Sequence, residues 1–133
     1  MEAVDTNVLV RLLAKDDPGQ AAVAERFVGD EGPVWVSHLV LVETLWVLES
    51  VFDLPKERIA RAVAALLDNS DLRLQDELAV ARALDLFRAN GKVDFADCLI
   101  LETARGAGHM PLATFDRALA RLPGTRLLPP SRR

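Results

Sequence analysis

The sequence predicts an α/β fold, with a short central parallel sheet that is flanked by helices on both faces. Short apolar segments alternate with longer amphipathic segments, and parallel strands need helical connections of this kind. Strands that are covered on both faces are apolar throughout, as in the run Val34-Trp35-Val36. The 133 residues contain no repeat and no Gly/Ser-rich linker, which suits a single domain. We expect residues 1–128 to form this domain and residues 129–133 to be a loose tail.

The elements of the N-terminal half follow from apolar runs and capping residues. Residues 3–5 predict a short strand that leads into a helix beginning near Thr6. Asp17 followed by Pro18 is typical of a helix start, because Asp caps the free N–H groups and Pro suits the first helical position. This second helix is predicted to end near Gly29. The next elements are a strand at 33–37, helices at 39–52 and 55–69, and a strand at 72–74.

The C-terminal half continues the alternation of helices and strands. Residues 76–90 predict an amphipathic helix with Leu78, Leu84 and Phe87 on its apolar side, and Asn90-Gly91 ends it. The remaining elements are a helix at 95–106, a strand at 111–114, a short helix at 116–121 and a strand at 125–128.

Composition excludes several classes of protein. No apolar run reaches the roughly 18 residues that a membrane span needs, and the first residues lack the pattern of a secretion signal. A single cysteine, Cys98, cannot form an internal disulfide, and its apolar neighbours predict a buried structural thiol. We therefore expect a cytoplasmic protein without a membrane partner.

The net charge argues against a simple nucleic-acid-binding surface. Sixteen Lys and Arg residues against 20 Asp and Glu residues give a net charge of −4. Proteins that bind nucleic acids usually carry a basic surface. An RNA-binding role would therefore depend on a local group of basic side chains, on a second subunit or on bound cations.

Glu43 is an acidic residue inside an apolar segment, residues 39–48. Its neighbours at helical spacing are all apolar, so no polar stripe surrounds it. An ionised carboxylate that is buried without a partner is costly, so this position predicts a cation, a metal ion or a proton. The alternative is a solvated or Arg-paired Glu at the edge of a helix hairpin. The apolar neighbours are Leu39, Val40, Trp46 and Val47.

Three further acidic residues lie where a predicted strand or loop meets a predicted helix. Asp5 and Asp116 each follow a strand, and ligands of open α/β sheets collect beyond the carboxyl ends of strands. Asp97 falls in the first turn of an apolar helix, where the helix dipole favours negative charge, and Asp94 is the natural N-cap of that helix. For Asp5, Asp97 and Asp116 the alternative is a helix-capping role alone.

If the fold brings these carboxylates together, they need compensation. Like charges raise one another's pKa values, and hard divalent cations such as Mg²⁺ or Mn²⁺ bind through carboxylates, waters and substrate phosphates. Such ions activate water and stabilise charge on a phosphate, as in many nucleases. The acids therefore predict a metal-dependent phosphodiester hydrolase.

Four segments in order resemble the PIN domain of VapC-type toxins: residues 5–10, Glu43, residues 94–100 and residues 113–116. The resemblance covers essentially the whole chain, with one small departure at Cys98, where Ala is more usual. It implies Mg²⁺- or Mn²⁺-dependent endonucleolytic cleavage of RNA, a homodimer and inhibition by a cognate antitoxin. It places the catalytic and metal-binding acids on Asp5, Glu43, Asp97 and Asp116, and supporting polar residues on Thr6, Asn7 and Thr114, with Asp94 as a further supporting residue.

The surface of residues 39–67 is more apolar than one buried face requires, and part of it is a candidate surface for an antitoxin helix. Its large apolar residues include Trp46, Phe52, Ile59 and Leu66. The alternative is that they belong to the ordinary core.

Other functions compete with this interpretation. A nuclease without metal would need paired histidines, and the chain has only His38 and His109, both in predicted loops. An aspartate-based phosphotransferase needs a second acid two residues after Asp5, where Asn7 stands, and a receiver domain needs a late Lys, but none follows Lys92. A degenerate PIN domain that serves as a non-catalytic binding module is the third alternative.

Overall fold

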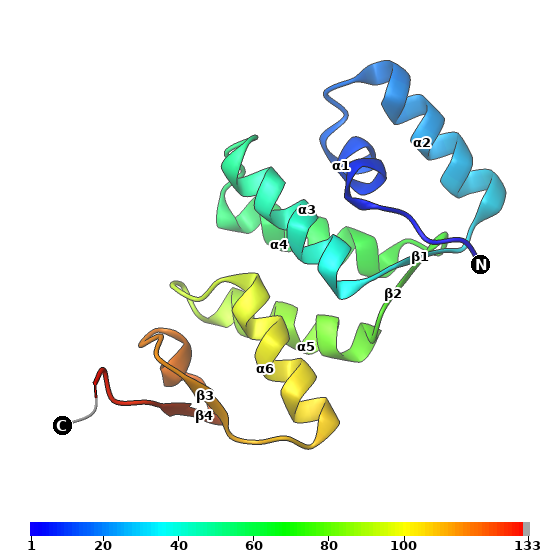
Figure 1. The fold of residues 1–133 in the computed structure, drawn as a ribbon. Coiled ribbons are helices and arrows are strands. Elements are labelled where there is room, and N and C mark those ends of the chain that lie inside the picture. The colour runs from blue at the N-terminus through cyan, green and yellow to red at the C-terminus, as the bar shows by residue number, and fades with distance from the viewer. Residues whose placement is uncertain (132–133) are drawn as a thin grey trace. The chain divides into compact units, whose positions relative to one another are not determined.

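The computed structural model describes residues 1–131 of the chain. It contains six α-helices and four three-residue strands in this range (Figure 1). The chain divides into two compact units, Met1–Glu77 and Leu78–Arg133, which we call the N-terminal unit and the C-terminal unit. Among the described residues, no helix has both the length and the apolar character needed to cross a membrane.

Capping side chains define the starts of the first three helices in the N-terminal unit. The carboxylate of Asp17 accepts a hydrogen bond from the backbone N–H of Gln20, with Pro18 at the first helical position. The hydroxyl of Ser37 accepts one from the N–H of Val40. Each such cap satisfies an N–H group that the helix itself leaves free. The helices of this unit are α1 (Thr6–Ala14), α2 (Pro18–Glu31), α3 (His38–Ser50) and α4 (Lys56–Asp68).

Two strands pair in parallel in the N-terminal unit, β1 (Val34–Val36) and β2 (Leu72–Leu74). Both strands bury their outer residues and expose the middle one, so the sheet has one core face. The strand predicted at residues 3–5 is reduced to a single bridge between Ala3 and Trp35. Burial of large side chains supplies the stability of the unit, at roughly 1.5–3 kcal/mol for each fully buried Leu, Ile or Val. The fully buried side chains include Leu9, Val34, Val36, Leu41, Leu48, Ile59 and Val63.

The C-terminal unit is built on two helices, α5 (Glu77–Ala89) and α6 (Phe95–Ala107). The rings of Phe87 and Phe95 meet edge to face, with centroids 5.8 Å apart and planes at 88°, a favoured aromatic geometry. Cys98 is fully buried and is not part of a disulfide, as predicted. Leu84 and Phe87 of the predicted apolar side are buried, whereas Leu78 is 60% exposed and the prediction for it is wrong, because it lies in the first turn of α5 away from the core.

A second parallel pair of strands completes this unit, β3 (Leu112–Thr114) and β4 (Thr125–Leu127), with the 3₁₀ helix η1 (Leu119–Arg121) between them. Gly124 precedes β4 with φ +90°, a left-handed conformation that favours glycine. A Cβ at this position would lie 2.9 Å from an Nη of Arg105. The backbone conformation therefore favours glycine here, and a larger residue would also displace the ends of the Met110 and Arg105 side chains.

The predicted α/β class with short parallel strands is confirmed, and most elements lie within a few residues of their predicted bounds. The sheet that was predicted as one is formed as two two-stranded sheets within residues 1–131. The short helix predicted at 116–121 is reduced to a turn and η1. Residues 128–131 contain no helix or strand, and the last two residues of the predicted tail, 132–133, lie outside the described residues.

Candidate active site

Asp5 lies at the N-cap of α1, where one carboxylate oxygen, Oδ1, accepts a hydrogen bond from the N–H of Val8 at 3.1 Å. The predicted alternative of a capping role is therefore real. Capping uses only part of the Asp5 carboxylate, because an ionised carboxylate has two oxygens and about four lone-pair sites. Asp5 is exposed, so Oδ2 is open to a further ligand from solvent.

Glu43 lies on the exposed face of α3, and the prediction that it is buried is wrong. Its apolar neighbours Leu39 and Trp46 are themselves 70% and 65% exposed, so the apolar sequence around Glu43 does not enclose it. The carboxylate accepts a hydrogen bond from the hydroxyl of Thr6, with 3.3 Å between Oγ1 and Oε1. The supporting position predicted for Thr6 thus has a definite contact, which connects the start of α1 to α3.

We expect Thr6→Val to reduce the proposed catalytic activity by about tenfold, the lower range for residues that orient a metal ligand. The substitution removes the hydroxyl that holds Glu43 while keeping the shape of the side chain. Thr6→Ser should retain most of the activity. Thermal unfolding of both variants should match that of wild type, because the contact lies at an exposed site. Equal activity in Thr6→Val and wild type would show that Thr6 has no role in orienting Glu43.

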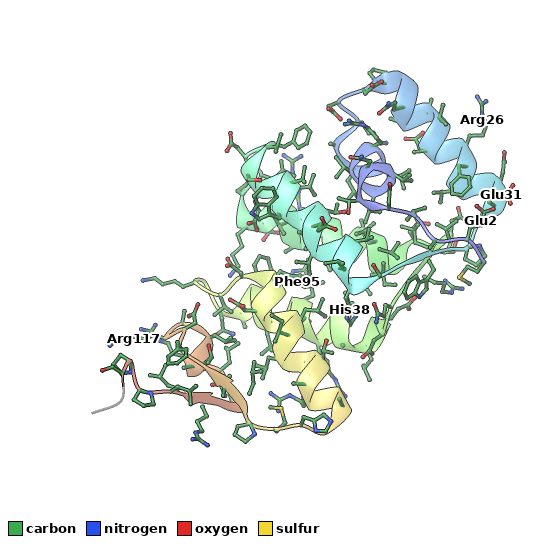
Figure 2. All side chains as sticks on the ribbon, viewed as in Figure 1. Glu2, Arg26, Glu31, His38, Phe95 and Arg117 are labelled. Carbon is green, nitrogen blue, oxygen red and sulfur yellow. The ribbon has the colours of Figure 1, made fainter. Side chains whose placement is uncertain are left out.

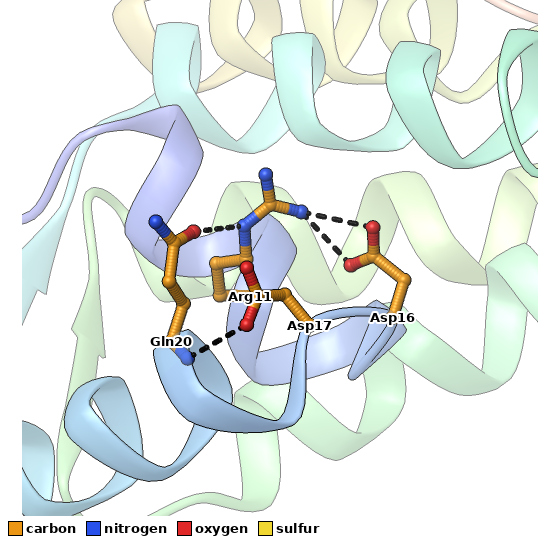
Figure 3. A network of polar contacts seen from close by, with 4 residues as sticks. All are labelled: Arg11, Asp16, Asp17 and Gln20. Atoms are coloured by element: carbon orange, nitrogen blue, oxygen red, sulfur yellow. Dashed lines mark hydrogen bonds and ion pairs between the residues drawn. The ribbon is translucent and has the colours of Figure 1, made fainter.

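An open groove of about 770 Å³ lies beside Asp5 within the N-terminal unit and is lined by residues of α1, α2 and the segment before α1. Asp5 and Asn7 are among its polar lining residues, and the lining also includes Arg11 and Gln20. Arg11 is fixed by Asp16, at 2.8 Å and 3.1 Å, and by Gln20, at 2.7 Å (Figure 3). Arg11 is therefore already engaged in an ion pair and a hydrogen bond.

The C-terminal unit holds a second group of acids at the start of α6. Asp94 takes the N-cap position, as predicted, but its side chain makes no capping hydrogen bond to α6. Asp97 follows in the first turn of the helix. Burial raises the pKa of the Asp97 carboxyl above its usual value, and the negative charges of Asp94 and Asp116 raise it further. Within this unit, the three carboxylates of Asp94, Asp97 and Asp116 are therefore close enough for their charges to interact.

Asp116 follows β3, and three hydrogen bonds fix its geometry. Its Oδ1 accepts from the N–H groups of Ala118 at 2.8 Å and Leu119 at 3.0 Å. Its own N–H donates to the hydroxyl of Thr114 at 2.9 Å, which gives the predicted supporting residue Thr114 a contact. Asp116 therefore does have a capping role. Because the residue is exposed, its other oxygen, Oδ2, is open to a further ligand, as in Asp5.

A comparison with protein-family models shows which family this arrangement belongs to. The model of the PIN domain matches residues 3–124. The chain belongs to the PIN domain family. PIN domains are generally nucleases, which agrees with the predicted activity at this coarser level. Curated proteins and solved structures give no match.

The donor set of this PIN domain fits a hard divalent cation, because all four candidate ligands are carboxylates. Within residues 1–131, no group of three or more His, Cys, Asp or Glu side chains is arranged as a metal-binding cluster. Mg²⁺ does not require one, since it keeps several waters and binds through one or two carboxylates together with substrate phosphates.

Sequence reasoning overlooked the acid that is actually buried. Glu102 on α6 is only 6% exposed and is paired with Arg105 at 3.0 Å. Cys98 and Leu99, four and three residues earlier, are apolar neighbours at helical spacing, which is the same pattern that predicts burial at Glu43. Because Arg105 pairs with it, the Glu102 carboxylate already has a partner within the fold and is not a candidate metal ligand.

The hydrogen bonds of His38 and His109 do not support the alternative of a metal-independent nuclease with paired histidines. His38 is the first residue of α3 and not part of a loop (Figure 2). Its ring Nε2 lies 2.7 Å from the carbonyl oxygen of Gln75, and its backbone N–H donates to the Gln75 side chain. The backbone N–H of His109 donates to the carbonyl of Ala104 just after α6. His38 therefore fixes the connection after β2, which is a structural role.

Proposed function

We propose that this PIN domain is an endoribonuclease that hydrolyses RNA phosphodiesters with Mg²⁺ or Mn²⁺. The observation that carries the proposal is the match of residues 3–124 to the PIN domain, together with the acids Asp94 and Asp116, whose charges add to burial in raising the pKa of Asp97. In a member of a nuclease family, a bound divalent cation would relieve this concentration of negative charge. The same cation provides the positive potential that an acidic protein needs when RNA phosphates approach.

The chain's own residues have distinct roles in this proposal. Asp5, Glu43 and Asp97 hold the metal, directly or through water, and Asp116 binds a second ion or positions the attacking water. A bound Mg²⁺ or Mn²⁺ supplies activated water and stabilises the charge on the scissile phosphate. Thr6 orients Glu43 through its hydroxyl, and Thr114 anchors the backbone of Asp116. No side chain needs to act as a nucleophile.

The test is cleavage of a mixed RNA substrate with Mg²⁺, with Mn²⁺ and with EDTA. We expect cleavage only with metal, and a loss of at least about a hundredfold in Glu43→Gln and Asp116→Asn. Asp30→Asn and Asp85→Asn, which remove exposed acids of α2 and α5, are matched controls and should cleave like wild type. RNA binding without cleavage by the folded wild type would leave the non-catalytic binding module as the function. A stable aspartyl phosphate formed from a small phosphodonor would instead support the phosphotransferase or receiver alternative.

We further propose that the nuclease is the toxin of a toxin–antitoxin pair, acting in the cytoplasm as a homodimer. This extension is supported by the resemblance of its acidic segments to VapC-type toxins. Ile59 and Leu66 are buried in the core of the N-terminal unit, so these two residues do not belong to the candidate antitoxin surface on residues 39–67. Expression of the chain with and without the products of flanking open reading frames tests the extension. Rescue of growth by one of them, with co-purification, is the expected result.

A further inference from the structure

Two aromatic side chains of the chain are largely exposed to solvent. It has five Phe, two Trp and no Tyr. Phe87 and Phe95 are buried, and Phe27 and Phe52 are half-buried. The two most exposed aromatic residues among those described are Trp46, at 65%, and Phe115, at 67%. Aromatic side chains gain much from burial, so an exposed ring beside a candidate site is a possible contact surface for a ligand.

Trp46 lies one helical turn after Glu43. Residues three apart on a helix are neighbours on its surface, so the indole lies on the same exposed face of α3 as the carboxylate. Leu39 is equally exposed on this face, four residues before Glu43. Trp46 therefore offers a flat aromatic surface directly beside a candidate metal ligand.

Phe115 lies between Thr114 and Asp116 in the C-terminal unit. The hydrogen bonds of Asp116 to Thr114, Ala118 and Leu119 fix the backbone on both sides of the phenyl ring. The ring is thus presented to solvent by a rigid turn. In both units, one of the two most exposed aromatic residues is next to a candidate catalytic carboxylate.

We infer that Trp46 and Phe115 are stacking surfaces for the bases of a single-stranded RNA substrate, an inference that rests on the proposed nuclease function. The net charge of −4 leaves little general attraction for phosphates. Stacking on aromatic rings does not depend on charge and tolerates any sequence, because every base has a π-face. A base held beside Glu43, or beside Asp116, would bring its own neighbouring phosphate to that carboxylate.

The fluorescence of Trp46 reports the stacking directly. Trp35→Phe leaves Trp46 as the only tryptophan, and this variant is titrated with a short unstructured RNA of randomised sequence. The titration is run at equilibrium in EDTA and by stopped flow in Mg²⁺, before cleavage proceeds. We expect saturable quenching in at least one condition, with weaker binding after Phe115→Leu. Absence of quenching in both conditions, while RNA binding is seen by anisotropy, would overturn the inference for Trp46.

A substitution series separates base stacking from an ordinary apolar contact. Trp46→Phe should keep most of the RNA affinity, whereas Trp46→Leu should lose about tenfold to a hundredfold, the effect of removing one stacked base. In cleavage assays the loss should appear in KM with little change in kcat. Leu39→Ala removes a similarly exposed but non-aromatic side chain from the same face and should leave RNA binding unchanged.

The outcomes distinguish this inference from the proposed function. If RNA binding depends on Trp46 but no metal-dependent cleavage occurs, the proposed nuclease function is wrong and the stacking inference stands. Cleavage that is equal in wild type, Trp46→Leu and Phe115→Leu would keep the nuclease and overturn the stacking. If Leu39→Ala and Trp46→Leu both change the sedimentation of the protein but not RNA binding, this face of α3 binds a second copy of the chain instead.

Discussion

Replacing Asp97 with Asn should raise the thermal stability of the metal-free protein while abolishing RNA cleavage. Burial and the charges of Asp94 and Asp116 disfavour the ionised carboxyl and raise its pKa. The dipole of α6 favours a negative charge in the first turn, but the net shift is upward, so the unfavourable effects are larger. Asn keeps the shape and removes the charge, and we expect a rise in Tm of a few degrees with a loss of cleavage of at least about a hundredfold.

The pH dependence follows from the same pKa shift. Below its usual pKa the carboxyl is protonated in both the folded and the unfolded state, so it has no effect on stability. As the pH rises from the usual value of 3.8 to the raised pKa of the folded state, the unfolded state loses its proton first and the folded state becomes less stable. Above that window the penalty is constant. The stability difference between Asp97→Asn and wild type should therefore grow through this window and then level off.

Thermal melts across this pH range, with and without Mg²⁺, check the prediction. Mg²⁺ should stabilise wild type more than Asp97→Asn, because the cation relieves the repulsion that the variant has already lost. Asp85→Asn, at an exposed position of α5, is the control and should show no pH-dependent gain. A metal-free Asp97→Asn protein that is less stable than wild type at neutral pH would contradict the account.

Replacing Arg105 with Met should destabilise the protein by about 1–3 kcal/mol, since the buried carboxylate of Glu102 is left without its partner. Nε of Arg105 donates to Glu102 at 3.0 Å, and Nη2 donates to the carbonyl of Pro123 at 2.8 Å. Arg105 is itself 38% exposed, so the cost should stay below that of breaking a fully buried pair. The guanidinium thus connects α6 to the turn before β4.

Urea unfolding measures this effect, with Arg82→Met at an exposed position of α5 as the control. The double variant Glu102→Leu/Arg105→Met should recover part of the lost stability, because no charge is left buried. If Arg105→Met and Arg82→Met unfold at the same urea concentration, Glu102 does not depend on Arg105.

The helices were predictable because their ends carry chemical signals. Asp17-Pro18 begins α2 as predicted, and the burial of Phe87 in α5 follows from the apolar spacing of that segment. The true length of the strand at residues 3–5 was not predictable. A segment of three residues does not show how many of them will pair with the backbone of a neighbouring strand. Only Ala3 forms a bridge there.

The acids show where reasoning from sequence succeeds and where it ends. Asp5 and Asp97 occupy the predicted helix starts, because capping and dipole effects act within a few residues. Glu43 was assigned to a buried position from its apolar neighbours, but those neighbours face solvent too. Burial depends on which helix face meets the core, and a helix that is apolar on all sides, such as α3, does not indicate this. For the same reason, the sequence of α6 did not show that Glu102 faces the core.

We propose that Asp5 and Asp97 are both required for metal-dependent RNA cleavage. The most direct test compares RNA cleavage by wild type, Asp5→Asn, Asp97→Asn and the double variant across a range of Mg²⁺ concentrations. Residues that act as a unit are strongly non-additive. We therefore predict that each single variant loses cleavage almost completely and that the double variant loses no more. Full metal-dependent cleavage by either folded single variant would contradict the claim.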